Sequence, residues 1–204
     1  VALAVGLGAF AADDNRSLGD KTIQFLTDLV KLDTTNPPGN ETRVANYLKQ
    51  VADANGIPNE VIGGEPRRMN FVARLKGTGK ARPLLLMAHS DVVPAERNQW
   101  TADPFGAELK NGYIYGRGTV DTKSLLAAEL AVMIEIKRRG LRLNRDIILV
   151  AEADEEAGST GIQWLIQHAW NKIDAEFAIN EGGSVSETKD GTKLFAIQTT
   201  EKIP

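Results

Sequence analysis

Acidic residues and one histidine follow apolar runs at several points along the chain. His89 and Asp91 come directly after the run LLLMA, and the acidic triplet DEE (154–156) comes shortly after a second run, IILVA. Glu181 follows EFAIN, and Asp121 precedes a stretch rich in alanine and leucine. One histidine, several carboxylates and no cysteine form a ligand set for zinc or a similar divalent ion. These residue types therefore indicate metal-assisted chemistry.

The spacing within these clusters suggests a division of roles. Grouped carboxylates resist ionisation because like charges repel, and a bound cation removes that penalty. In the His89-x-Asp91 pair, one ring nitrogen can bind a metal while Asp91 accepts a hydrogen bond from the other, although the sequence does not decide which nitrogen binds. Of Glu155 and Glu156, one can be a ligand and the other a base acting on water whose pKa zinc lowers to about 7. A second metal about 3.5–4 Å away would need a bridging carboxylate, a role open to Asp121.

Hydrophobic periodicity predicts the elements that position these residues. Helices are expected over 18–33, over 40–56 with Asn40 as its cap, over 125–140 and over 161–173, and strands over 70–77, 83–89, 146–154 and 176–180. Strands that alternate with helices predict a layered α/β fold with a largely parallel sheet. Ligands in such sheets bind beyond the carboxyl ends of the strands, where the polar clusters fall.

Composition limits the classes of function and location. The 204 residues carry 24 basic and 27 acidic side chains, a formal net charge of −3, so there is no basic footprint for nucleic acid. Residues 1–11, VALAVGLGAFA, are too short to span a bilayer and are expected to be the end of a secretory signal peptide with a cleavage site at AFA. We therefore expect a periplasmic or secreted protein, without membrane attachment after signal removal, whose domain occupies residues 12–204.

Five strings occur in an order that resembles a known family: NPPGNE, MAHSDVVP, DPFGAELKNGYIYGRGTVDTKS, EADEEAGSTG and INEGG. The family is that of the co-catalytic zinc hydrolases, which includes aminoacylase, acetylornithine deacetylase, succinyl-diaminopimelate desuccinylase and glutamate carboxypeptidase. Each string alone is weak evidence, but together they are specific. The glutamate in INEGG most resembles the carboxypeptidase-S and aminoacylase-like branches. The resemblance implies an α/β three-layer sandwich around a largely parallel central sheet.

The same resemblance implies roles for individual residues. His89 and Glu181 would bind one zinc ion, Glu156 would bind a second, and Asp121 would bridge the two. Cobalt or manganese could replace zinc. Asp91 resembles the residue that orients the histidine ligand, and Glu155 resembles the general base.

The implied activity is hydrolysis of N-acyl amino acids or of C-terminal peptide bonds, so the partner is a small acylated amino acid or peptide. The family's last zinc ligand is a histidine near its C-terminus, and His168 does not match that position. TTEKIP falls about where family members lead into a lid or dimerisation domain, so residues 12–204 are expected to be the N-terminal part of a catalytic domain that forms homodimers at full length. The alternative is a metal-binding fragment that is catalytically incomplete alone.

Simpler interpretations stand beside these roles. Taken alone, His89 would be a satisfied polar residue and DEE a solvated turn, and only their combination with the other acidic stretches favours metal binding. Asp121 could cap the helix that follows it. Lys123 is expected to form a structural ion pair, and His168 to lie on the surface of a helix.

Overall fold

The computed structural model describes residues 16–196. The expected signal-peptide segment at 1–11 and the TTEKIP segment lie outside the described residues. No helix within residues 16–196 combines the length and the apolar character needed to cross a bilayer.

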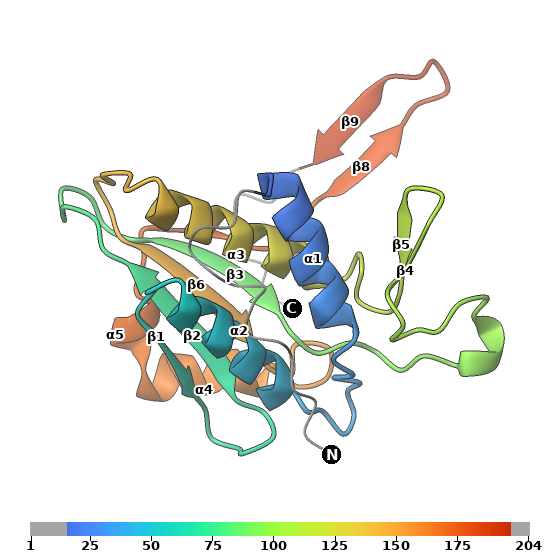
Figure 1. Cartoon of the computed structure of the whole chain (residues 1–204), viewed down its shortest axis with the longest axis horizontal. Helices are drawn as coiled ribbons and strands as arrows, with labels where there is room; N and C mark the ends of the chain where they lie inside the picture. The colour runs from blue at the N-terminus through green and yellow to red at the C-terminus, as the bar shows by residue number, and fades with distance from the viewer. Residues whose placement is uncertain (1–15, 197–204) are drawn as a thin grey trace.

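A five-stranded sheet forms the centre of the fold (Figure 1). Its strands, in spatial order, are β1 (Asn59–Ile62), β2 (Asn70–Leu75), β6 (Ile147–Glu152), β3 (Leu84–His89) and β7 (Phe177–Ile179). β3 is parallel to both β6 and β7, whereas β2 is antiparallel to β6 and to β1. Because β1 and β6 both oppose β2, every strand except β2 runs in one direction, which confirms a largely parallel sheet.

Helices cover both faces of this sheet and complete three layers. On one face lie α1 (Leu18–Val30), α2 (Thr42–Ala54) and α3 (Lys123–Arg138), and on the other lie α4 (Thr160–His168) and α5 (Trp170–Ile173). The alternation of strand side chains separates two hydrophobic clusters: Ala73 and Leu149 face the first group of helices, whereas Val72 and Ile148 face the second. The predicted layered α/β architecture is therefore observed.

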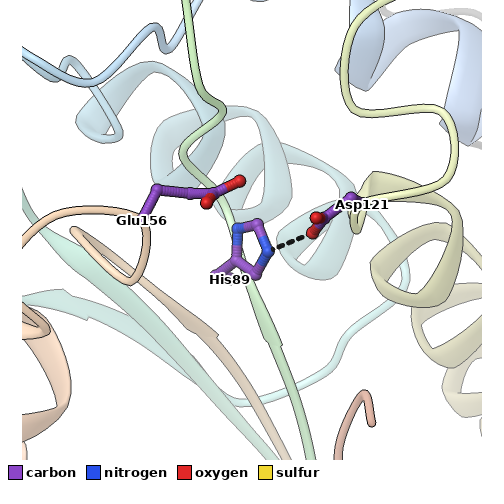
Figure 2. Close-up of side chains that lie close together, drawn as sticks. All are labelled: His89, Asp121 and Glu156. Atoms are coloured by element: carbon purple, nitrogen blue, oxygen red, sulfur yellow. Dashed lines mark hydrogen bonds and ion pairs between the residues drawn. The ribbon is translucent and has the colours of Figure 1, made fainter. Parts of the chain in front are cut away.

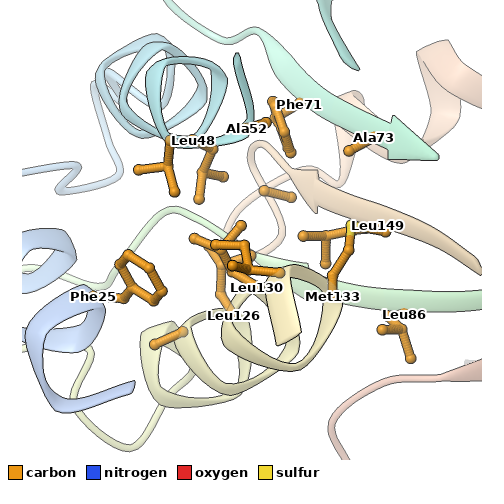
Figure 3. Close-up of a cluster of buried hydrophobic side chains, with 14 of the residues drawn as sticks. Phe25, Leu48, Ala52, Phe71, Ala73, Leu86, Leu126, Leu130, Met133 and Leu149 are labelled. Atoms are coloured by element: carbon orange, nitrogen blue, oxygen red, sulfur yellow. The ribbon is translucent and has the colours of Figure 1, made fainter. Parts of the chain in front are cut away.

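The larger cluster fixes α3 against the sheet and so fixes the start of α3 beside the strand ends (Figure 3). Leu126, Leu130 and Met133 recur at helical spacing along α3 and are fully buried. They pack with Leu149 of β6 and with Phe25 of α1 in the same cluster. Burial of each side chain of this size contributes about 1.5–3 kcal/mol, so the position of α3 is well determined.

The expected cap of the second helix and the expected single helix over 161–173 both differ from the structure, while α1 and α3 differ from their expected ranges by two or three residues at their ends. The cap of α2 is Glu41 rather than Asn40, and its side chain makes no capping hydrogen bond because it is buried in the interior. The single helix expected over 161–173 is divided at Ala169, whose φ of −143° is not helical. Apolar periodicity continues across this break, so the pattern alone could not reveal it.

Two hairpins and a short helix extend from the layers and were not anticipated. They are β4 (Glu108–Lys110) with β5 (Tyr113–Tyr115), β8 (Ser184–Glu187) with β9 (Lys193–Ala196), and the 3-10 helix η2 (Arg97–Gln99). Both hairpins project away from the central sheet (Figure 1). Their strands are too short for the alternation of apolar and polar residues to be recognised in the sequence.

Candidate metal centre

The carboxyl ends of three neighbouring parallel strands bring the chemically important side chains together. His89 is the last residue of β3 and lies opposite Glu152, the last residue of β6. The loop carrying Glu155 and Glu156 follows β6, and Glu181 comes two residues after β7 ends. Because these strands run in the same direction, their ends meet at one edge of the sheet, as the sequence predicted.

Asp121 reaches this edge from the turn before α3. Gly118 in that turn has a φ of 85°, a conformation that favours glycine, and a Cβ there would lie 2.8 Å from the Val92 side chain. Gly182 and Gly183, directly after Glu181, also have positive φ values. These glycines let the backbone turn closely beside the site.

His89 lies at the centre of the cluster (Figure 2). Its Nε2 is 2.8 Å from Asp121 Oδ1 and 3.5 Å from Glu181 Oε1. Its ring belongs to two groups whose possible ligand atoms lie within 4.8 Å of one another: one with Asp121 and Glu156, the other with Glu155 and Glu181. Figure 2 shows that Glu156 and Asp121 approach the ring from different sides.

The contacts of His89 Nδ1, at the opposite edge of the ring, determine which nitrogen is available to a ligand. His89 Nδ1 is 3.0 Å from the backbone oxygen of Asp91 and 3.4 Å from Asp91 Oδ1. A carbonyl oxygen can only accept a hydrogen bond, so Nδ1 carries a proton and donates a hydrogen bond to the backbone oxygen of Asp91. Nε2 therefore faces the carboxylates of Asp121 and Glu181, and a proton or another cation must lie between these groups.

The electrostatics of the cluster show the same need for positive charge. Burial opposes the charged form of His89, but hydrogen bonds to Asp91 and Asp121 and the charge of Glu181 outweigh it and raise the histidine pKa to about 10. Burial raises the pKa of Glu156, and the charge of Asp121 raises it further. Burial and the charge of Asp121 likewise raise the pKa of Glu181. A divalent cation would stabilise the charged carboxylates and take the place of the proton on Nε2.

Asp91 connects the histidine to the acidic loop. Its side chain is fully buried and accepts hydrogen bonds from the backbone N–H of Glu155 at 3.1 Å and of Glu156 at 3.0 Å. The same carboxylate lies beside His89 Nδ1, so it touches both parts of the cluster. Asp91 is therefore placed where an orienting residue must be, while Glu155 remains exposed at the solvent side.

Two polar residues next to the site, Asn36 and Arg68, were given no role from the sequence, although Asn36 is the first residue of the string NPPGNE. They contact Asp91 and Asp154 from segments distant in the sequence, and neither lies at the end of an apolar run. Glu152 is buried with one carboxylate oxygen unpaired, and burial followed by the charge of Glu155 raises its pKa to about 7. From the sequence, alternation at the end of the strand could place either Glu152 or Asp154 near the site, and the strand register puts Glu152 opposite His89.

Of two expectations for residues outside the cluster, the one for Lys123 is partly wrong and the one for His168 is confirmed. Lys123 is structural, but the predicted ion pair is wrong: its Nζ donates to the backbone oxygens of Leu29 at 3.0 Å and Leu32 at 2.7 Å. Burial lowers the pKa of Lys123 to about 7, although the charge of Asp33 opposes this. His168 lies on the surface of α4, as expected, and belongs to neither candidate ligand group among the described residues.

Comparison with known proteins assigns the family. The model of peptidase family M20/M25/M40 matches residues 85–200, which is more than half of the chain and includes every candidate ligand. The chain belongs to peptidase family M20. Membership agrees with the resemblance seen in the sequence motifs.

The lengths of related proteins show what share of each relative this chain matches. A probable succinyl-diaminopimelate desuccinylase from Staphylococcus aureus is 39% identical over 145 residues, which are 70% of this chain and 34% of the relative. Succinyl-diaminopimelate desuccinylase 2 from Ruegeria sp. is 33% identical over 186 residues, 84% of this chain and 44% of the relative. The chain therefore spans between a third and a half of the length of these relatives.

A solved structure shows the same fold. The M20 family metallo-carboxypeptidase from Sulfolobus solfataricus superposes with a TM-score of 0.72 at 27% identity, and the match covers 84% of this chain and 39% of that one. The three-layer arrangement is thus shared with an M20 enzyme.

Proposed function

We propose that the whole protein is a metal-dependent hydrolase, with zinc as the expected metal, that cleaves amide bonds of N-acyl amino acids or C-terminal peptide bonds. The observation that carries this proposal is the environment of His89 Nε2, whose partners within residues 16–196 are the carboxylates of Asp121 and Glu181. The names of the relatives support it, because a desuccinylase and a carboxypeptidase both hydrolyse amide bonds.

The residues present fit a divalent ion. Imidazole nitrogen and carboxylate oxygens suit zinc, cobalt and manganese, and the chain has no cysteine that would select a softer ion. His89, Asp121, Glu156 and Glu181 would hold the metal, and Asp121 is the proposed ligand shared between two ions. When bound, zinc would polarise the scissile carbonyl and make water easier to deprotonate.

Glu155 is the proposed general base. Its backbone N–H is fixed by Asp91, whereas its carboxylate is exposed and stands in one group with His89 and Glu181. In that position it can take a proton from the attacking water and later give it to the leaving amine, the two steps that amide hydrolysis requires. Asp91 accepts a hydrogen bond from His89 Nδ1 and so fixes the orientation and the tautomer of the ring.

The substrate side chain, the periplasmic or secreted location and the homodimer stay predictions. We place the activity in the full-length gene product, because the chain spans 34% of the length of the desuccinylase from S. aureus.

Substitution of Glu155 tests the assignment. In the full-length, zinc-loaded protein, Glu155→Gln should lower kcat on N-acyl amino acids by about 100- to 10,000-fold, the usual contribution of a general base. Metal content measured by elemental analysis should be unchanged. The matched variant Glu156→Gln should lose zinc. If Glu155→Gln releases the metal, Glu155 is a ligand rather than the base, and an unaltered kcat would exclude both roles.

A further inference from the structure

Asn36 joins two buried carboxylates that the metal centre depends on. Its side chain is 2% exposed, and its Nδ2 donates one hydrogen bond to Asp91 Oδ2 at 2.7 Å and a second to Asp154 Oδ1 at 2.8 Å. A side-chain amide has two N–H donors, so both are used. Without these donors the two carboxylates would face each other as buried like charges.

Arg68 fixes which way the Asn36 amide points. Arg68 Nη2 donates to Asn36 Oδ1 at 3.0 Å and to the backbone oxygen of Pro38 at 2.9 Å, while Nη1 forms an ion pair with Asp154. A guanidinium can only donate, so the amide oxygen must face Arg68 and the NH2 group must face the carboxylates. The positive charge of Arg68 also offsets part of the negative charge in this cluster.

The backbone of Asn36 is anchored to the segment that carries the histidine. Its N–H donates to the backbone oxygen of Val92 at 2.9 Å, and the N–H of Val92 donates to the backbone oxygen of Thr34 at 3.2 Å. Thr34 Oγ1 adds a hydrogen bond of 2.7 Å to the backbone oxygen of Ser90. These three hydrogen bonds join the loop before α2 to the loop after β3.

The two carboxylates held by Asn36 control different parts of the site. Asp91 contacts His89 Nδ1 and receives the N–H groups of Glu155 and Glu156. Asp154 begins the acidic loop with a φ of 66° and accepts a 2.6 Å hydrogen bond from Thr160 Oγ1. Asn36 thus joins the carboxylate beside the histidine to the residue that starts the loop.

We propose that Asn36, oriented by Arg68, is a positioning residue that holds the His89 ring and the Glu155–Glu156 loop in register with each other. The role extends the proposed function, because it assumes that His89 and Glu156 bind metal. Neither Asn36 nor Arg68 touches the metal ligands' donor atoms. Their effect is transmitted by Asp91 and Asp154.

Asn36→Leu tests this role because it removes all three side-chain hydrogen bonds with little change of volume and without a new charge. Hydrogen exchange followed by NMR should show the backbone amides of Glu155 and Glu156 exchanging about tenfold faster or more, which corresponds to the loss of roughly one hydrogen bond. Zinc affinity, measured by competition with a chelator, should fall about 10- to 100-fold, as for other residues that orient metal ligands. With Co²⁺ in place of zinc, the visible absorption spectrum of Asn36→Leu should differ from that of the wild type.

A matched variant separates positioning from general destabilisation. Asn59 at the start of β1 also donates to a carboxylate, Asp53 Oδ1 at 2.7 Å, and to the backbone oxygen of Ile57 at 2.9 Å, but it lies at the far edge of the sheet from the site. Asn59→Leu should leave the exchange of Glu155 and Glu156 and the zinc affinity unchanged. Equal effects in the two variants would overturn the proposal.

Arg68→Lys covers the case in which Asn36→Leu does not fold. The arginine side chain is 18% exposed, and lysine keeps the charge while removing the two-nitrogen fork that reaches Asn36 and Asp154 together. Faster exchange of Glu155 and Glu156 is expected again. Exchange that matches the wild type in a folded variant excludes the role. The exchange measurement needs no metal, so absence of zinc binding in the wild type would count against the proposed function and not against the positioning role.

Discussion

At the scale of single residues, the orientation of the His89 ring determines what the site can bind. The backbone oxygen of Asp91 accepts a hydrogen bond from the Nδ1 N–H, which leaves Nε2 facing Asp121 and Glu181. The sequence predicted that Asp91 would serve one ring nitrogen but left open which one. The answer depends on a backbone carbonyl, and no residue type in the sequence specifies the direction of a carbonyl.

Lys123→Met should destabilise the protein through the loss of a structural contact. The buried ammonium group donates to the backbone oxygens of Leu29 and Leu32 at the end of α1. With methionine the Leu29 oxygen would keep the N–H of Leu32 at 3.1 Å, whereas the Leu32 oxygen would lose the donor that Lys123 supplies. An unsatisfied buried polar group costs about 1–3 kcal/mol, so the free energy of unfolding in urea should fall by that order. Lys49→Met, at an exposed pair with Asp53, should change it by about 0.5 kcal/mol or less. Equal stability of Lys123→Met and wild type would contradict this account.

The candidate ligands could be recognised from the sequence, whereas the residues that support them could not. His89 and Glu181 each follow a short apolar run, a pattern that places a side chain at the end of a strand. Asn36 and Arg68 act on the site from positions 55 and 86 residues away from Asp91 and Asp154, respectively, and such contacts leave no periodic signal. Arg68 in particular lies in a loop with no motif around it.

At the scale of elements, the beginning and the end of β6 have separate tasks. Glu152, at the end of β6, lies opposite His89. Asp146, just before the start of β6, forms hydrogen bonds with residues at the end of β2 and directly after it. Asp146 Oδ1 accepts the N–H of Gly77, and Oδ2 accepts Arg74 Nη1 and Lys76 Nζ, each at 2.9 Å. The sequence predicted both strands, but not that β2 runs antiparallel to β6.

Asp146→Asn should lower stability in a pH-dependent way. Burial favours the neutral acid, but the hydrogen bonds from Gly77, Lys76 and Arg74 outweigh it and lower the pKa of Asp146 from 3.8 to about 2. The folded-state pKa is lower than the unfolded one, so the stabilisation is present above about pH 4 and is lost as the pH falls through about 2. The variant should lose about 1.5–3 kcal/mol at pH 7 and pH 5, and less at pH 3. Urea unfolding at the three pH values measures this, and a difference independent of pH would refute the assignment.

At the scale of the whole molecule, the helix layers pack against both faces of the sheet and so fix the strand ends that carry the candidate ligands. α1, α2 and α3 cover one face, α4 and α5 cover the other, and the ends of β3, β6 and β7 carry the cluster. This architecture followed from the alternation of apolar runs and helical faces in the sequence. The hairpins β4–β5 and β8–β9 did not, because each consists of strands of three or four residues.

The central claim, that His89 organises a metal site in this chain, is tested most directly by metal content per chain. The purified chain is equilibrated with zinc, freed of excess ion and analysed for elemental composition, in parallel with His89→Ala. Because His89 belongs to both candidate ligand groups, the wild-type chain should retain at least one tightly bound zinc ion and His89→Ala should retain none. No bound zinc in the wild-type chain, or equal zinc in both proteins, would contradict the account.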